Sequence, residues 1–247
     1  MTRSDVVVIP VYNHGAAIGA VVADVRAHGL PVILVDDGSE PNCAAVLDAL
    51  TANDDAITLV RLQTNQGKGG AMMAGLRHAA ALGHSHALQI DADGQHDLAD
   101  ISAFLKQSQA HPEAVICGCP IFDESVPKSR LYGRYATHIW VWINTWSFAI
   151  TDSMCGFRVY PLAPVVKLIN EVNIGRRMDF DVELMVRLYW RDVAIINQPT
   201  RVSYPSDGVS HFNLLDDNLR ITAMHTRLFF GMLLRSPLLL SRKLGLL

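Results

Sequence analysis

The chain has 247 residues, half of them hydrophobic, which is enough to bury one sizeable core. Its formal net charge of −3 excludes the strong basic excess of most nucleic-acid-binding proteins, so no nucleic acid is expected as a partner. Its four cysteines lack the spacing of a zinc site, and no apolar stretch reaches the roughly 18 residues of a membrane-spanning helix.

Apolar runs and helical spacings alternate through the first half of the chain. The expected strands are Val6–Val11, Val32–Val35, Ile57–Leu62, Ala87–Ile90 and Ala114–Cys119. The expected helices between them are Ala16–His28, Cys43–Leu50, Gly69–Leu82 and Leu98–Gln109. Strands that are apolar on both faces and alternate with helices predict an α/β fold, with a mostly parallel sheet flanked by helices.

The second half of the chain is less regular. The helices expected there are Tyr132–Ile150, Phe180–Trp190 and Asn213–Leu234. The strands expected there are Cys155–Pro161 and Val193–Gln198. After Leu234 the chain continues with Arg235, Ser236 and Pro237 and then with leucine-rich and basic residues.

Polar residues follow three of the predicted strands. They are Pro10–Asn13, Asp36–Ser39 and Asp91–His96. Ligands of open parallel sheets bind beyond the carboxyl ends of the strands, so these three segments are expected on one edge. Asp91 and Asp93 can offer oxygens to Mg²⁺ or Mn²⁺, with Gln95 as a third ligand, and such an ion can neutralise a diphosphate leaving group. The alternative is a solvated turn, with Asp97 capping the next helix.

Two further segments suit a nucleotide. A carboxylate at Asp36 or Asp37 can bond a ribose hydroxyl or a base N–H, although a plain turn is the alternative. The glycines of residues 65–70 let the backbone approach phosphate, and Lys68 adds a positive charge near a helix N-terminus. The spacing is not that of a Walker A motif, and no G-x-G-x-x-G follows the first strand. A glycine-rich turn is the alternative here.

Taken in order, VVVIPVYN, VDDGS, NQGKGGAMMAGL and QIDADGQHD resemble the family 2 glycosyltransferases. The likeness is closer to the polyprenyl- (dolichyl-) phosphate mannosyltransferase-like branch. The later segments CGFRVY, DVEL and DGVSH are similar to the same branch, and the resemblance covers about residues 5–212. It implies a GT-A fold and a metal-dependent, inverting transfer of a hexosyl group from a nucleotide diphosphate sugar.

The resemblance also implies roles for single residues. The donor-binding residues would be Pro10, Tyr12, Asn13, Asp36, Asp37, Lys68 and Asp91. The metal, Mg²⁺ or Mn²⁺, would be held by Asp91, Asp93 and Gln95. Arg158, in CGFR, would meet a phosphate of the donor or of the acceptor.

The chain departs from the family at two positions. His14 stands where the family commonly has glutamate, and Asp207 stands where the branch has an arginine that helps to hold the acceptor phosphate. We therefore expect a lipid-linked or amphiphilic acceptor, with polyprenyl phosphate as the alternative. The alternatives of another class are a sugar-nucleotide nucleotidyltransferase and a non-catalytic nucleotide-sugar-binding protein.

A hydroxyl acceptor needs a general base, whereas an ionised phosphate does not. Asp181 is the first candidate and Asp179 the second, while Glu183 could orient the loop. Asp152, shortly before CGFR, is a further candidate. Each of the carboxylates near the helix start has the alternative of ordinary first-turn charge, which the helix dipole favours.

The C-terminal segment, residues 212–247, carries five Lys or Arg against two Asp, a local charge of +3. Because its apolar residues alternate with these charges, it suits a membrane surface, and the alternative is a helix packed on the enzyme. We expect a glycosyltransferase domain over residues 1–211, with a nucleotide-sugar-binding half (1–119) and an acceptor half (120–211). The expected location is cytoplasmic, peripheral on the inner face of the membrane.

Overall fold

The computed structural model describes residues 3–122, 126, 128–203 and 213–245. The strands are β1 (Asp5–Val11), β2 (Val32–Asp36), β3 (Ile57–Arg61), β4 (His86–Gln89), β5 (Val115–Phe122), β6 (Arg158–Pro161) and β7 (Ile195–Val202). The helices are α1 (Gly15–Ala27), α2 (Pro41–Asn53), α3 (Lys68–Ala81), α4 (Ile101–Ala110), α5 (Lys128–Thr145), α6 (Leu162–Glu171), α7 (Phe180–Trp190) and α8 (Leu214–Lys243), with one 3₁₀ turn, η1 (Leu98–Asp100).

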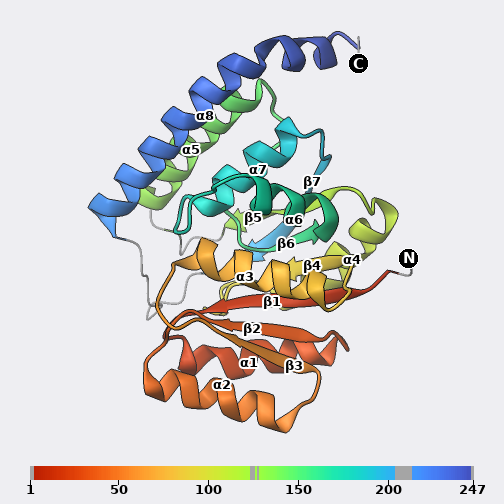
Figure 1. Ribbon diagram of the computed structural model, residues 1–247, viewed down its shortest axis with the longest axis vertical. Helices are drawn as coiled ribbons and strands as arrows, with labels where there is room; N and C mark the ends of the chain where they lie inside the picture. The colour runs from red at the N-terminus through yellow and green to blue at the C-terminus, as the bar shows by residue number, and fades with distance from the viewer. Residues whose placement is uncertain (1–2, 123–125, 127, 204–212, 246–247) are drawn as a thin grey trace.

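Within these residues the strands form one sheet in the order β3-β2-β1-β4-β6-β5-β7 (Figure 1). β6 runs antiparallel to its neighbours β4 and β5, and the remaining pairs are parallel. The expected α/β fold with a mostly parallel sheet is therefore confirmed.

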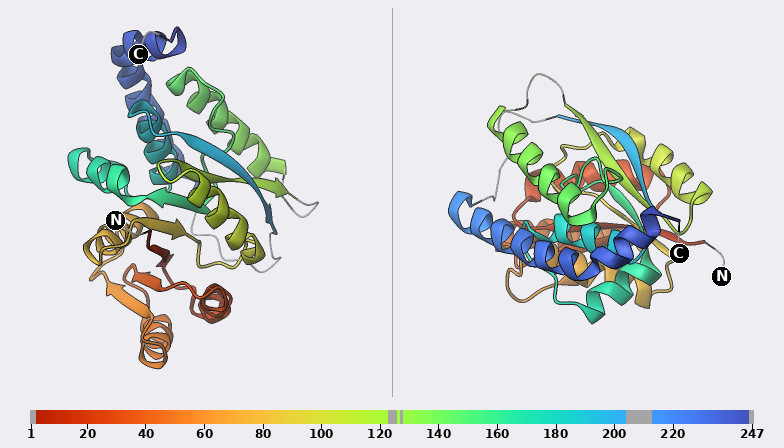
Figure 2. Two further views of the ribbon diagram at one scale, coloured as in Figure 1. Left: turned by 90° about the vertical axis from the view of Figure 1, so that its right-hand side faces the viewer. Right: turned by 90° about the horizontal axis from the view of Figure 1, so that it is seen from above.

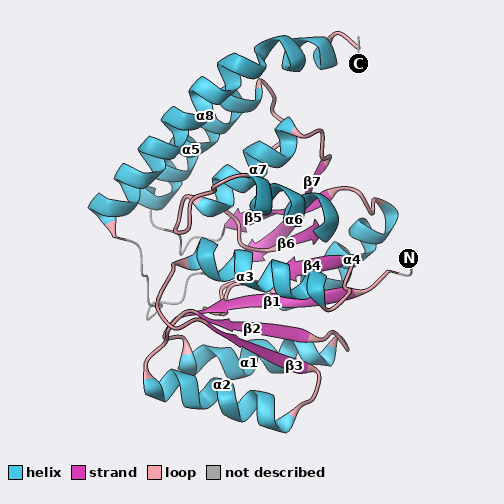
Figure 3. Cartoon of the chain, viewed as in Figure 1, coloured by secondary structure: helices cyan, strands magenta, loops and turns pink. Residues whose placement is uncertain are grey.

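Helices cover both faces of the sheet (Figure 3). Side chains alternate along a strand, so Val6 and Val8 of β1 pack on one face while Val7 and Ile9 pack on the other. The first face is covered by α3, α6 and α7, and the second by α1, α2 and α4. This double cover explains why the strands are apolar on both sides.

The register of the strands brings the polar segments to one edge. Val11 pairs with Asp36, and Asp36 pairs with Arg61, so β1, β2 and β3 end level with one another. β4 runs parallel to β1 and leads directly to Asp91. The residues that follow these strands therefore meet at a common carboxyl edge, as the sequence predicted.

Helix α8 continues beyond the expected end at Leu234 and passes through Pro237 to Lys243. A proline lacks the N–H that would bond the carbonyl four residues earlier. The hydroxyl of Ser236 instead donates to the carbonyl of Leu233 at 2.8 Å. Leu239, on the turn that follows, is 3% exposed, so packing on the protein stabilises the helix past the proline.

Other boundaries also differ from the prediction. Helix α5 ends at Thr145 rather than Ile150, because Trp146 has a left-handed backbone with φ 52°. Helix α6 was not predicted, although Pro164 is tolerated in its first turn and Leu168 and Ile169 lie on its buried face. Its apolar spacing was the signal that could have revealed it.

Helices α5 and α8 lie side by side (Figure 2). Met224, Leu228 and Met232 of α8 are buried in the same core cluster as the residues of α3 and α7. No described helix is long and apolar enough to cross a bilayer.

Candidate active site

A row of alternating charges crosses the carboxyl edge of the sheet. Lys68, the first residue of α3, places its Nζ 2.8 Å from Oδ1 of Asp91 and 3.0 Å from Oδ2 of Asp181. Nη1 of Arg158 lies 3.4 Å from Oδ1 of Asp181 on the far side. Asp91 follows β4, and Asp181 lies in the first turn of α7. The structure thus brings four of the expected site residues into one cluster.

A buried polar network supports this cluster from inside the protein. Gln89 donates to Asp181 at 3.2 Å, and the hydroxyl of Tyr160 donates to Gln89 at 3.0 Å. The guanidinium of Arg158 donates to the Tyr160 hydroxyl at 3.1 Å and to the carbonyl of Ser153 at 2.7 Å. Because Arg158 is completely buried, its contacts are with the protein interior and not with an open surface.

Asp91 and Asp93 differ in their charge environment. Burial alone would raise the pKa of Asp91, but Lys68 and His96 hold that pKa well below its usual range. Burial, followed by the charge of Asp91, raises the pKa of Asp93. Asp93 accepts a bond from the backbone N–H of Gln95 at 3.0 Å. Among the described residues it has no cationic partner within ion-pair distance.

These residues fit a divalent cation. The described residues hold no group of three or more His, Cys, Asp and Glu side chains that could bind a metal alone. Mg²⁺, however, is commonly bound by one or two carboxylates, with substrate phosphates and water as the other ligands. Asp93, a half-buried carboxylate without a cationic partner among the described residues, meets that requirement.

The CGFR segment packs directly against Asp91. A Cβ atom added at Gly156 would lie 2.1 Å from Oδ2 of Asp91, so a side chain there would displace the carboxylate. Asp152 holds this turn by accepting bonds from the backbone N–H groups of Met154 and Cys155, each at 2.8 Å. Burial would raise the pKa of Asp152, but His138 and Arg134 keep it below its usual range.

Asp36 and Asp37 point into the protein. Asp36 accepts bonds from Arg61 and from the backbone N–H of Ser39, each at 2.9 Å. Asp37 accepts bonds from the backbone N–H groups of Gln66 and Gly67 at 2.7 and 2.8 Å. Since both carboxylates are almost completely buried, their contacts fix the turn after β2 and attach the glycine-rich loop to it.

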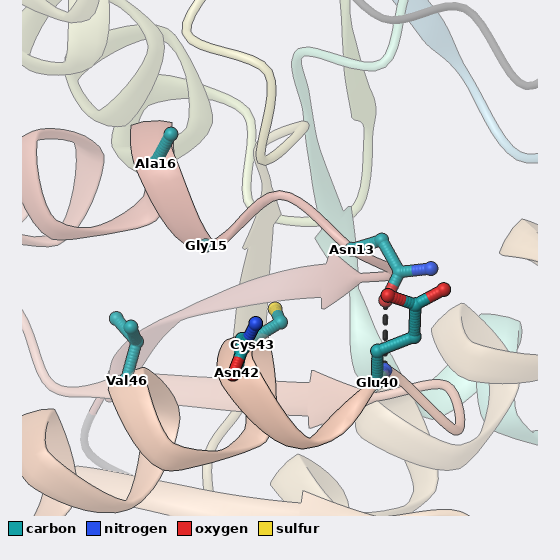
Figure 4. A pocket seen from close by; sticks show the side chains of 7 residues that line it. All are labelled: Asn13, Gly15, Ala16, Glu40, Asn42, Cys43 and Val46. Carbon is teal, nitrogen blue, oxygen red and sulfur yellow. Dashed lines mark hydrogen bonds between the residues drawn. The ribbon is translucent and has the colours of Figure 1, made fainter.

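The turns after β1 and β2 are also attached to each other. Asn13, with φ 58°, accepts a bond from the backbone N–H of Glu40 at 2.8 Å and donates its own N–H to Ser39 at 3.1 Å. A cavity of about 260 Å³ lies beside this contact, between the first turns of α1 and α2 (Figure 4). Pro10 and Tyr12 are half-buried at the same end of β1.

Asp179 and Glu183 accept hydrogen bonds that stabilise α7 and the loop before it. Asp179 accepts a bond from the backbone N–H of Arg177 at 3.1 Å. Glu183 is fully buried and accepts bonds from Arg187 at 2.7 Å, from Arg227 at 3.1 Å and from the backbone N–H of Gly175 at 2.9 Å. Glu183 thus connects α7 to α8 and to the loop before α7. Asp207 and the rest of the DGVSH segment lie outside the described residues.

The structure reveals neighbours of the site that the sequence analysis did not assign. Gln89 and Tyr160 support Asp181, and a polar Gln89 within an otherwise apolar strand was a usable signal. Nε2 of His96 lies 3.7 Å from Oδ2 of Asp91. Arg176 and Arg177 contact the amide side chains of the glycine-rich loop, and no pattern in the sequence placed them there.

The sequence of the chain is similar to those of known glycosyltransferases. The sequence model of glycosyl transferase family 2 matches residues 6–164. The chain is 25% identical over 196 residues to a UDP-N-acetylglucosamine–dolichyl-phosphate N-acetylglucosaminyltransferase of Methanococcus voltae, covering 72% of this chain and 77% of that one. It is 25% identical over 226 residues to a polyprenol monophosphomannose synthase of Mycolicibacterium smegmatis, covering 85% and 81%.

A solved structure shows the fold. Glucosyl-3-phosphoglycerate synthase from Mycobacterium tuberculosis, in complex with Mn²⁺, UDP-glucose and phosphoglyceric acid, superposes with a TM-score of 0.66. The match covers 93% of this chain and 79% of that one at 15% identity. The expected GT-A type of fold is therefore confirmed.

Proposed function

Because the chain belongs to glycosyl transferase family 2 and is a glycosyltransferase, we propose that it transfers a hexosyl group, with inversion, from a nucleoside diphosphate sugar to a lipid acceptor. The observation that carries the proposal is the pair Asp91 and Asp93 at the carboxyl edge. Asp91 is neutralised by Lys68, while Asp93 has no cationic partner among the described residues. That arrangement suits a metal–diphosphate complex.

A bound Mg²⁺ or Mn²⁺ would be held by Asp93, with Asp91 and Gln95 on the same turn, and would neutralise charge that develops on the leaving diphosphate. The other interactions with the donor would come from residues of the protein. Lys68 fixes the position of Asp91. The turns after β1 and β2 surround the nucleoside.

Three of the four candidate bases are held in ion pairs, which favours an acceptor that needs no base. Asp181 lies between Lys68 and Arg158, so both of its oxygens are already engaged by cations of the protein. Asp152 and Glu183 are likewise buried in ion pairs. Deprotonation by a protein base is unnecessary for an already ionised phosphate. Among lipid acceptors we therefore favour a polyprenyl phosphate, the acceptor class to which the names of the two relatives point.

Exposed apolar side chains on α5 and α8 support contact with a membrane surface. Those on α5 include Tyr132, Tyr135, Ile139 and Trp140, and those on α8 include Phe230, Leu233, Leu234, Leu238 and Leu240. The two groups are adjacent, since the ring centroids of Trp140 and Phe229 lie 6.3 Å apart. We propose that this face rests on the cytoplasmic leaflet, with the lipid acceptor beside it.

Product analysis tests the proposed transfer. The protein is incubated with Mn²⁺, a panel of UDP- and GDP-sugars, and a short-chain polyprenyl phosphate. Acceptor-dependent release of UDP or GDP is the expected result. Release of pyrophosphate would indicate nucleotidyl transfer instead. A matched lipid acceptor with a free hydroxyl and no phosphate tests the acceptor class, and preferential use of it would contradict the polyprenyl phosphate.

A further inference from the structure

The carboxyl edge carries an excess of negative charge before any ligand enters. Its carboxylates are Asp36, Asp37, Asp91, Asp93 and Asp181. The cations in contact with them are Arg61, Lys68 and Arg158. The formal charge of these eight groups is −2. The two phosphates of a nucleoside diphosphate sugar add about two further negative charges, so one divalent cation still leaves the edge with a net negative charge.

Lys68 does not supply the missing positive charge. Its Nζ is within 3.0 Å of both Asp91 and Asp181, so its charge is already neutralised. Arg158 is fully buried, and Arg61 pairs with Asp36 and Asp48. The diphosphate therefore needs cationic groups from another segment.

Two adjacent arginines before α7 meet this need. Nη1 of Arg176 donates to the side-chain oxygen of Gln66 at 3.3 Å, and Nη1 of Arg177 donates to that of Asn65 at 3.3 Å. Both side chains are exposed, and among the described residues neither forms an ion pair with a carboxylate. A guanidinium has five N–H donors, so most of those on each arginine face solvent.

The backbone fixes the arginines against the glycine-rich loop. The carbonyl of Arg176 accepts a bond from the N–H of Gly70 at 2.9 Å. A Cβ atom at Gly67 would lie 2.6 Å from the same carbonyl, so only glycine allows this approach. Arg177 is also near enough to Asp37 for its charge to act on that carboxyl. The pair therefore lies beside β2 and β3, on the donor side of the sheet and not beside α5.

From these contacts we infer that Arg176 and Arg177 bind the phosphates of the nucleoside diphosphate donor. This inference rests on the proposed function, since it assigns two contacts to the same donor site. The planar fork of an arginine suits phosphate oxygens, and such charge-assisted bonds are among the stronger ones. The amides of Asn65 and Gln66 hold the two forks in place before the donor arrives.

Equilibrium titration of the full chain with UDP and with GDP, in the presence of Mn²⁺, tests the inference. The variants are Arg176→Gln, Arg177→Gln and the double change, with Lys106→Gln as the control. Lys106 is likewise exposed, and it lies on α4, which covers the opposite face of the sheet from α3 and α7. We expect each single change to weaken binding of the nucleoside diphosphate about tenfold or more, and the control to leave it unchanged.

Two further titrations identify the group that the arginines bind. Uridine and guanosine, which lack phosphate, should bind the parent and the double variant equally. A short-chain isoprenyl phosphate should also bind both equally, because the arginines lie away from α5. Unchanged binding of UDP and GDP in the double variant would overturn the inference, as would an equal loss for the nucleosides or a loss confined to the isoprenyl phosphate. If the parent chain binds neither UDP nor GDP, the proposed function itself fails.

Discussion

Replacing Lys68 with methionine removes one charge from between two carboxylates while keeping most of the side-chain volume. The side chains of Lys68, Asp91 and Asp181 are 19%, 22% and 7% exposed, so solvent screens their interaction only weakly. Removing one partner of a buried ion pair typically costs about 3–5 kcal/mol, because the remaining charge is left uncompensated. We expect Lys68→Met to lower the free energy of unfolding by about that amount at neutral pH.

The same substitution should change how stability depends on pH. Burial raises the pKa of Asp91, and in the parent Lys68 and His96 outweigh burial and hold the pKa below the ordinary 3.8. A lowered pKa contributes stability that is present above 3.8 and is lost only as pH falls through the folded-state value. Without Lys68, burial dominates and the folded-state pKa rises. The variant therefore gains stability as pH falls, and the difference from the parent should shrink between about pH 7 and pH 4.

Urea unfolding at several pH values measures this difference. Lys106→Met is the control, since Lys106 is exposed on α4, and we expect its effect to stay within about 0.5 kcal/mol. A loss below about 1 kcal/mol in Lys68→Met, or a loss that does not change with pH, would refute the reasoning that Lys68 neutralises two buried carboxylates.

Three further predictions concern the metal, the CGFR turn and the membrane. Asp93→Asn should abolish the Mn²⁺-dependent part of nucleotide-sugar binding in calorimetry without lowering the unfolding midpoint, and a retained metal dependence would contradict the metal assignment. Gly156→Ala should lower turnover and cost about 1–3 kcal/mol of stability, because its Cβ would lie 2.1 Å from Asp91; Gly133→Ala, which meets nothing within 4 Å, is the control. The double change Phe230→Ser and Leu234→Ser removes side chains that are 61% and 83% exposed and should abolish co-sedimentation with anionic vesicles at low salt; equal sedimentation would exclude this face.

The first half of the fold could be predicted closely because its strands are buried on both sides. The run from Val32 to Val35 became β2 with one further residue, and Ile57–Leu62 became β3 with one fewer. In the second half, tertiary packing determines where the elements end more than the local sequence pattern does. The helix was expected to end at Leu234, but α8 continues through Pro237. The Ser236 hydroxyl bonds a carbonyl that the proline cannot, and Leu239 is buried. Neither contact is visible in a sequence.

The edge at which the polar segments meet could also be predicted, since parallel strands align their carboxyl ends. The partners of each side chain could not. Gln89 and Asp181 are hydrogen-bonded although they are 92 positions apart. Arg158 of β6 contacts the same carboxylate because the antiparallel register of β4 and β6 places it beside Gln89. Such contacts depend on which elements pack together, and helical or strand periodicity carries no information about that choice.

A residue whose type suits a ligand can instead be fully engaged in contacts within the protein. Lys68 is the cation that the sequence offers for phosphate, yet two carboxylates already neutralise it. Asp37 suits a ribose, yet its oxygens accept two backbone N–H bonds of the glycine-rich loop. An anion that enters this edge must interact with charges that remain uncompensated. In the described residues Asp93 and the exposed Arg176 and Arg177 form no ion pair, and they are the groups that we propose for the divalent cation and for the donor phosphates.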